Sequence, residues 1–477
     1  MTSKSVAHFH QPNALESSIQ VSSCTLAEVF AGEIPIVKGE KTIRGNLRIP
    51  VYQRPYLWGT KEIDRLINDI KKHRKTNTSQ DYPQYYLGTI ILQQSSDGHL
   101  NIIDGQQRVI TMALIQAENG LPIPDLCITS PISIERIKNN VAYIRQYERD
   151  LLSQINPNEI NITLVITRRE DDAYTFFETQ NTGGVRLNGV DIIKAHHLRA
   201  IPVQGGRQDT YAHTWEAQRS LPELVVLLLK ARRWNLLRWQ QVPPEKDPKG
   251  IKTAIISDFS EAVKPDGPSV GYLHVISQQN QRFQLPAVPF AIRQPLNSGA
   301  NFIDYLQAFG QVYHRLFRED SDPDIPDEYY TFRKEVIDVI DGTAFLRDFF
   351  QISMLCYVSR FGFEHIWETA LWLFRYTYAP RLINKRTVRE DSIPSFIRSD
   401  HYLIDHILQS FTHEELIEYA KRFSYDVNSE NLNGNTVKKR FLNRVAVYFN
   451  EFSPGFEGGY DSALLAAIKA ITKENSL

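Results

Sequence analysis

A strand–turn–strand–helix pattern around residue 100 constrains the fold of this chain more than any other feature. Two runs, "YYLGTIILQQ" (85–94) and "HLNIID" (99–104), are strand-like, and "SSDG" between them is typical of a hairpin turn made by Gly98. The next run, "RVITMALIQ", suits a helix despite its β-branched residues. The pattern predicts a hairpin whose second strand passes through a tight turn at Gly105 into a helix.

This turn carries four polar side chains whose chemistry suits a charged ligand. The helix would direct its free N–H groups and positive dipole end at the turn, which is how anion sites are built. Arg108 would add a guanidinium fork for phosphate, and Asp104 would hold a divalent metal or orient a water. Gln106 and Gln107 would position a water or read a base. A solvated Asp-Gly turn at a helix start accounts for the same residues equally well.

A second polar stretch, "IPVYQRPYLW", precedes a run of helical period at 62–74. Gln53 and Arg54 stand before a proline, which disfavours helical backbone at Arg54. In one interpretation Tyr56 and Trp58 pack on the helix and Arg54 makes a structural ion pair. In the other, Arg54 reaches the same anion as Arg108, and Tyr56 or Trp58 forms a wall of the pocket.

A third stretch, "ETQNTGGVRLNGVDIIKAHHLRA", reads as a helix stop followed by a new helix. Asn181 would be a turn residue and Asp191 a helix cap, or both would lie near the anion together with Lys194. His196 and His197 are adjacent, so a helix would point them about 100° apart. They cannot form a metal pair at the i, i+4 spacing.

Basic runs occur in the second half of the chain. "RYTYAPRLINKRTVR" (375–389) contains five basic residues and no acid, "KKRFLNR" (438–444) contains four, and "KARRW" (230–234) is a third run. Such runs are either solvated faces or contacts to nucleic acid. The candidate DNA-binding residues are Arg375, Arg381, Lys385, Arg386, Lys438, Lys439 and Arg440.

Composition limits the class of protein. The formal net charge is −1 over 477 residues, so any nucleic-acid surface must be a local patch. The three cysteines, Cys24, Cys127 and Cys356, form no C-x-x-C pair and indicate neither a disulfide framework nor a cysteine zinc site. The chain shows no signal peptide and no apolar run near the ~20 residues of a membrane span, which predicts a cytoplasmic protein.

The patterns predict an α+β fold, with a small mixed sheet and helices first and a mainly α-helical half after it. Four parts are expected: a flexible N-terminus (1–24), a sheet-containing domain that carries the anion site (25–204), a helical domain (205–400) and a small helical subdomain (401–477).

The ordered set "IPVYQRPYLW", "YYLGTIIL" leading into "IIDGQQR", and "NTGGVRLNGVDIIKA" resembles the N-terminal domain of GmrSD-type restriction proteins, an anti-phage defence family. The resemblance is close over about residues 25–200. It implies a ParB/sulfiredoxin-like fold and nucleotide hydrolysis at the D-G-Q-Q-R element, coupled to recognition and cutting of modified foreign DNA. The implied site comprises Gln53, Arg54, Asp104, Gly105, Gln106, Gln107 and Arg108, with Asn181, Gly184, Asp191 and Lys194 in second rank. Mg²⁺ is the expected cofactor, at Asp104, and a nucleoside triphosphate is the expected substrate.

The chain departs from relatives that end in an HNH-type nuclease. "DHILQSF" (405–411) lacks the proline of the "His-Ile-x-Pro" element, and no clear metal histidine follows. We therefore expect a separate nuclease-bearing subunit of the same family as a partner, beside DNA, and leave a homo-oligomer open. Two alternatives remain: a DNA-sensing module that binds nucleotide or DNA without turnover, and a nuclease that uses Asp405 and His406.

Overall fold

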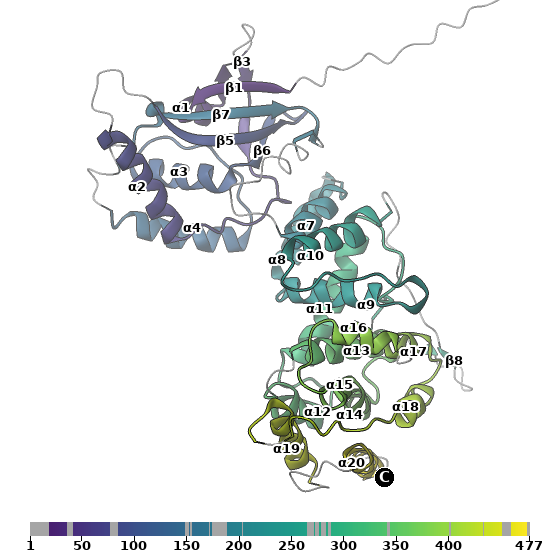
Figure 1. The fold of residues 1–477 in the computed structure, drawn as a ribbon. Helices are drawn as coiled ribbons and strands as arrows, with labels where there is room; N and C mark the ends of the chain where they lie inside the picture. Colours follow the sequence, from purple (N-terminus) through teal and green to yellow (C-terminus); the bar gives the residue numbers. More distant parts are fainter. Residues whose placement is uncertain are drawn as a thin grey trace, which may run out of the picture. The chain divides into compact units, whose positions relative to one another are not determined.

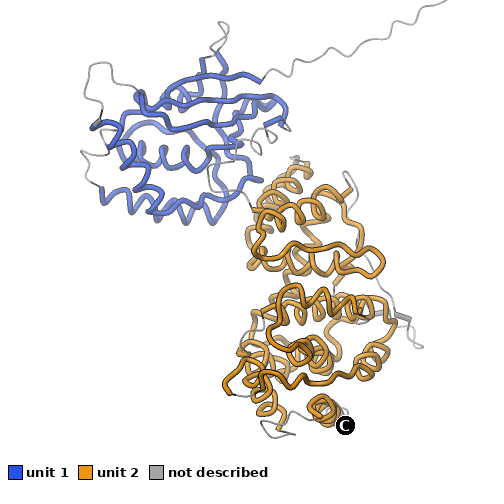
Figure 2. Tube along the Cα trace, viewed as in Figure 1, with its two compact units in different colours: residues 1–186 blue, residues 187–477 orange. Residues whose placement is uncertain are grey.

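The computed structural model describes residues 19–35, 42–76, 84–147, 152, 155–170, 172–173, 188–202, 204–264, 271, 276–277, 283–284, 288–340, 344–399, 402–432, 434–450 and 459–474. The chain forms two compact units, residues 1–186 and 187–477 (Figure 2).

The first unit is built on a mixed five-stranded sheet with strand order β1-β7-β5-β6-β4. The strands are β1 (Gln20–Thr25), β4 (Asn46–Arg48), β5 (Tyr85–Gln94), β6 (His99–Asp104) and β7 (Ile160–Thr167). β5 pairs antiparallel with β6 and parallel with β7, while β1 is antiparallel to β7 and β4 parallel to β6. β2 (Glu33–Pro35) and β3 (Thr42–Arg44) form a separate antiparallel pair. The predicted hairpin and mixed sheet are confirmed.

Helices cover one face of this sheet. α3 (Gln106–Glu118) runs along it, with α2 (Thr60–Thr76) and α4 (Pro131–Ile144) beyond (Figure 1). Ile67 of α2, Ile90 of β5 and Ile110 of α3 share one buried core, and α1 (Leu26–Ala31) adds Leu26 and Val29 to it. α3 is buried on almost every side. Burial explains why a run of β-branched residues forms a helix here, because tertiary packing outweighs the small propensity differences between residues.

The second unit is helical and is organised around α13 (Ala344–Phe361). α9 (Leu221–Arg233), α11 (Ala300–Phe317), α14 (Ile366–Thr377), α16 (Ser392–Arg398) and α17 (Leu403–Gln409) pack against α13. The remaining helices are α7 (Gly189–Arg199), α8 (Arg207–Ala217), α10 (Pro248–Ile256), α12 (Asp327–Phe332), α15 (Ala379–Ile383), α18 (His413–Arg422), α19 (Val437–Phe449) and α20 (Tyr460–Glu474), and a short β8–β9 pair joins Ile276–Ser277 to Phe283–Gln284. The mainly helical second half is confirmed.

The division between the units lies earlier than the boundary expected at residue 204. α7 belongs to the second unit because it packs on α8 and α10. The segment expected to form a subdomain from residue 401 begins with α17, which packs on α13 within the same unit. None of the described helices is long and apolar enough to cross a membrane.

Candidate functional site

The turn between β6 and α3 has the backbone that the sequence predicts. Asp104 ends β6, and Gly105 caps α3 with a φ of 91°, in the left-handed region that favours glycine. A Cβ atom at Gly105 would lie 2.7 Å from Cγ1 of Ile90, so the sheet leaves no room for a side chain there. The first turn of α3 is thereby held directly against β5.

Gln106 and Gln107 are 6% exposed and bind the backbone of residues 54–58. Gln106 Nε2 donates to the carbonyl of Arg54 at 2.6 Å. Gln107 Oε1 accepts from the N–H groups of Leu57 (2.8 Å) and Trp58 (3.1 Å). Its Nε2 donates to the carbonyl of Pro55 at 3.1 Å. These amides therefore fasten residues 54–58 to α3, whereas their place in the sequence predicts side chains that face a water or a base.

Arg108 lies against a bulge in β5. Its Nη1 donates to the carbonyl of Leu87 at 3.0 Å and its Nη2 to that of Thr89 at 2.7 Å. The bulge is at Gly88, where the register with β7 shifts and φ is 116°. A Cβ atom at Gly88 would collide with the Arg108 guanidinium. A glycine is therefore required for this arginine to dock.

Asp104 and Arg108 form the partly exposed pair of the turn. Asp104 Oδ2 lies 3.6 Å from Arg108 Nη2, and the side chains are 31% and 25% exposed. An arginine has five N–H donors, so the two carbonyl bonds and the contact with Asp104 do not use all of them. The acid and one of the two predicted guanidinium groups thus meet at the start of α3. The backbone of the other, Arg54, is held at the same helix turn through Gln106.

Tyr56 is part of the core and forms no wall of an open pocket. It is 0% exposed, and its hydroxyl lies 2.8 Å from Thr111 Oγ1 and accepts from Asn140 Nδ2 at 3.1 Å. Burial raises the pKa of Tyr56. Trp58 is half-buried, with its carbonyl accepting from Asn140, and Gln53 is also half-buried. The packing interpretation of Tyr56, which the sequence left open, is the one that the structure supports.

The other nucleotide-binding candidates lie in the second unit or outside the described residues. Asp191 forms a capping box with Asn188 at the start of α7. Lys194 Nζ lies 2.9 Å from Glu216 Oε1 with both side chains buried, and burial lowers the pKa of Lys194. Both side chains thus have structural contacts within the second unit. Asn181 and Gly184 lie outside the described residues.

Three of the seven candidate DNA-binding residues, Arg375, Arg381 and Lys438, are buried. Arg375 Nε and Nη2 donate to the Asp461 carboxylate at 2.8 and 2.7 Å, which ties α14 to α20. Lys438 Nζ donates to the carbonyl of Asn428. Lys385 and Arg386 are exposed, and Lys439 and Arg440 are half-exposed. The buried three serve the core of the helical unit, so they are unsuited to contact DNA.

Asp405 and His406 also have structural contacts. Asp405 is 4% exposed, its Oδ1 lies 2.6 Å from Arg293 Nη1, and its carboxylate accepts from the N–H of Leu236. The ring of His406 stacks on Tyr419, with centroids 3.7 Å apart. The Asp405 carboxylate is therefore engaged in a nearly buried ion pair with Arg293.

The second unit contains a cavity that no pattern in the sequence predicts. Its volume is about 420 Å³. Its lining includes the basic and aromatic side chains Lys230, Trp234, Trp239, Lys246 and Arg389, together with Glu390. Two basic runs noted separately in the sequence, 230–234 and 375–389, meet here. Nothing in either run reveals that the other lies beside it.

The first unit is thus an α+β domain with an acid–guanidinium pair at a strand-to-helix turn. Residues 36–198 match the family model described as "GmrSD restriction endonuclease, N-terminal domain", and this part of the chain is such a domain. Residues 207–434 match a family of unknown function, DUF7834. No curated protein matches the chain. The resemblance noted in the sequence is confirmed.

Proposed function

We propose that this chain is a component of a restriction system that acts on foreign DNA, and that its first unit binds and hydrolyses a nucleoside triphosphate. The match of residues 36–198 to a restriction endonuclease domain supports the first part. The observation that carries the second part is the partly exposed Asp104–Arg108 pair at the N-terminus of α3. A helix N-terminus beside a guanidinium favours phosphate.

In the proposed chemistry the Asp104 carboxylate and the Arg108 guanidinium have separate tasks. Asp104 aligns the attacking water, and Arg108 with the first N–H groups of α3 stabilises the charge on the phosphates. Mg²⁺ is usually held by one or two carboxylates together with substrate phosphates, and the partly exposed Asp104 carboxylate fits that requirement. Bound Mg²⁺ would neutralise phosphate charge.

Gln106 and Gln107 act as positioning residues in this proposal. Their amides hold residues 54–58 against α3, which fixes the backbone from which the Arg54 side chain departs. Arg54 then serves as the second cation for the triphosphate. This role differs from the one expected from the sequence because both amides are nearly buried.

The test is turnover by the purified full-length chain with each common nucleoside triphosphate and Mg²⁺. Asp104→Ala should abolish phosphate release while the circular dichroism spectrum is unchanged. Asp97→Ala is the matched control, because Asp97 is an exposed acid in the turn before β6, at the opposite end of that strand from Asp104. Undiminished release by the Asp104 variant, or no release by the wild type with any triphosphate, would reject the proposal.

A DNA-sensing role for the second unit, with a separate family member as the nuclease, is a second candidate. The cavity lined by Trp239, Lys246 and Arg389 favours it, because aromatic faces stack on bases and basic side chains bind phosphates. DNA binding should weaken steeply with salt. Lys246→Ala and Arg389→Ala should each reduce the salt slope by about 1. Salt-insensitive binding would contradict a DNA-contacting surface.

A further inference from the structure

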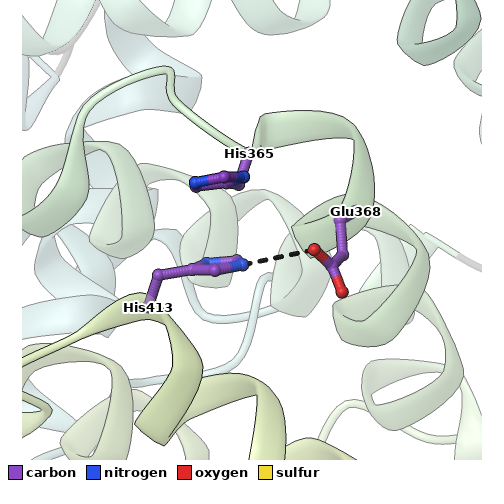
Figure 3. Close-up of side chains that lie close together, drawn as sticks. All are labelled: His365, Glu368 and His413. Carbon is purple, nitrogen blue, oxygen red and sulfur yellow. Dashed lines mark hydrogen bonds and ion pairs between the residues drawn. The ribbon is translucent and has the colours of Figure 1, made fainter. Parts of the chain in front are cut away.

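Two histidines and a glutamate from separate turns of the second unit lie together, away from the site proposed above. His365 caps α14, Glu368 lies in the first turn of α14, and His413 begins α18. One ligand atom of each lies within 4.8 Å of the other two. Figure 3 shows the two imidazole rings one above the other and the Glu368 carboxylate beside the ring of His413.

The distance between the donor atoms of His413 and Glu368 suits a shared metal ion. His413 Nε2 lies 3.4 Å from Glu368 Oε2. Two ligands bound to Zn²⁺ at about 2.0–2.1 Å in a tetrahedral arrangement are roughly 3.3 Å apart. The two donor atoms therefore already have nearly the separation that a shared ion requires.

Hydrogen bonds determine which ring nitrogen of His413 is available. The hydroxyl of Tyr357 donates its one hydrogen to the carbonyl of Glu364 at 2.7 Å, so its oxygen is an acceptor toward His413 Nδ1 at 3.0 Å. Nδ1 therefore carries a hydrogen, and in the neutral ring the lone pair is on Nε2, facing Glu368. Metal-binding histidines are commonly oriented in this way, with the far nitrogen donating to a fixed acceptor.

The Glu368 carboxylate is also held in its orientation by a neighbouring side chain. Its Oε1 accepts from the indole N–H of Trp372 at 3.3 Å, which leaves Oε2 directed at His413. A carboxylate facing an imidazole lone pair is unfavourable unless a proton or a cation lies between them.

His365 is the third and most exposed member of the cluster. Its side chain is 48% exposed, and its ring stacks on that of His413 with centroids 4.6 Å apart and an interplanar angle of 16°. Parallel rings cannot both point a lone pair at one ion, so the His365 ring must turn when the ion binds. Its exposure leaves room for this rotation. Glu364 Oε1, 3.5 Å from His365 Nε2, adds negative charge beside the site.

We propose that His365, Glu368 and His413 bind one divalent transition-metal ion, with a coordination position left open to solvent. Two imidazoles and one carboxylate are the ligand set of several catalytic zinc sites and of non-haem iron sites. Mg²⁺ and Ca²⁺ prefer oxygen ligands and fit this set poorly. The proposal is independent of nucleotide hydrolysis in the first unit.

The test uses the tag-free full-length protein, stripped with a chelator and titrated with Zn²⁺ in a calorimeter. One equivalent should bind to the wild type. Glu368→Gln and His413→Gln should each weaken binding by at least tenfold. His406→Gln is the matched control, because its ring stacks on Tyr419 and is no part of the cluster, and it should bind like the wild type.

His365→Ala keeps the test decisive if the Glu368 and His413 variants fold poorly, because His365 is the most exposed of the three side chains and its removal should leave the fold intact. Co²⁺ should give visible d–d absorption in the wild type that His365→Ala reduces, and a Mg²⁺ titration should be the same in the wild type and in His365→Ala. Absence of stoichiometric Zn²⁺ binding, or full binding by Glu368→Gln and His413→Gln, would overturn the proposal. Equal loss in the His406 control would do the same.

Discussion

Gln107→Leu is the substitution that best separates a positioning role from a water-orienting role for the glutamines. Leucine has nearly the shape of glutamine, so the change removes hydrogen bonds and creates little empty space. Three bonds are lost, to the N–H groups of Leu57 and Trp58 and to the carbonyl of Pro55. A typical intramolecular hydrogen bond contributes about 1 kcal/mol net, so the first unit should lose about 3 kcal/mol of unfolding free energy.

The expected loss translates into a thermal shift. For a unit of 150–250 residues, each kcal/mol moves Tm by roughly 2–4 °C, so the loss predicts a fall of about 6–12 °C. The assay is urea unfolding of the protein, with hydrogen exchange in peptides from β5, β6 and α3 as the readout. This readout reports the first unit alone, which matters because a chain with two units need not unfold in one step.

Gln116→Leu is the matched control for this prediction. Gln116 lies on the same helix and is 2% exposed, and its Nε2 has no hydrogen-bond partner among the described residues. Its replacement should be neutral or stabilising, because an unsatisfied buried amide is removed. Equal stability of Gln107→Leu and wild type, or equal losses in the two variants, would refute the positioning role.

Two further predictions concern backbone strain and pH. Gly88→Ala should cost the first unit about 2–4 kcal/mol, because it strains a residue at φ 116° and displaces the guanidinium of Arg108. The same exchange assay measures it, and a loss below about 1 kcal/mol would contradict the docking of Arg108 against this glycine. Asp322 accepts two hydrogen bonds from Arg315. These bonds are the main reason that the pKa of Asp322 lies below its usual 3.8. Because the unfolded chain binds the proton more tightly, the stabilisation is complete well above pH 3.8 and is lost as pH falls below it. The difference in urea stability between wild type and Asp322→Asn should therefore shrink between about pH 6 and pH 3, and a constant difference would contradict the assignment.

Local patterns in the sequence predict the elements of the first unit well. Strands at 85–94 and 99–104 agree with β5 and β6, and the helical period at 62–74 lies within α2. The need for glycine at 105 follows from the tight turn alone. These features depend on neighbouring residues, which is why alternation, period and turn residues are sufficient to find them.

Contacts between distant residues are what the sequence does not reveal. Gln107 binds residues some 50 positions earlier, so its neighbours in the chain suggest an exposed polar turn. Arg375 stands in a basic run without acids, yet its partner Asp461 is 86 residues away. His365 and His413 are likewise far apart in the sequence, whereas His196 and His197 are adjacent in it. In each case the partner comes from a distant part of the sequence.

The most direct test of nucleotide hydrolysis at the turn is a structure of the full-length protein with Mg²⁺ and a non-hydrolysable triphosphate analogue. We expect the phosphates at the N-terminus of α3, in contact with Arg108, with Asp104 on the metal side. An analogue bound to any other part of the chain, with Asp104 and Arg108 unchanged and exposed to solvent, would contradict the account.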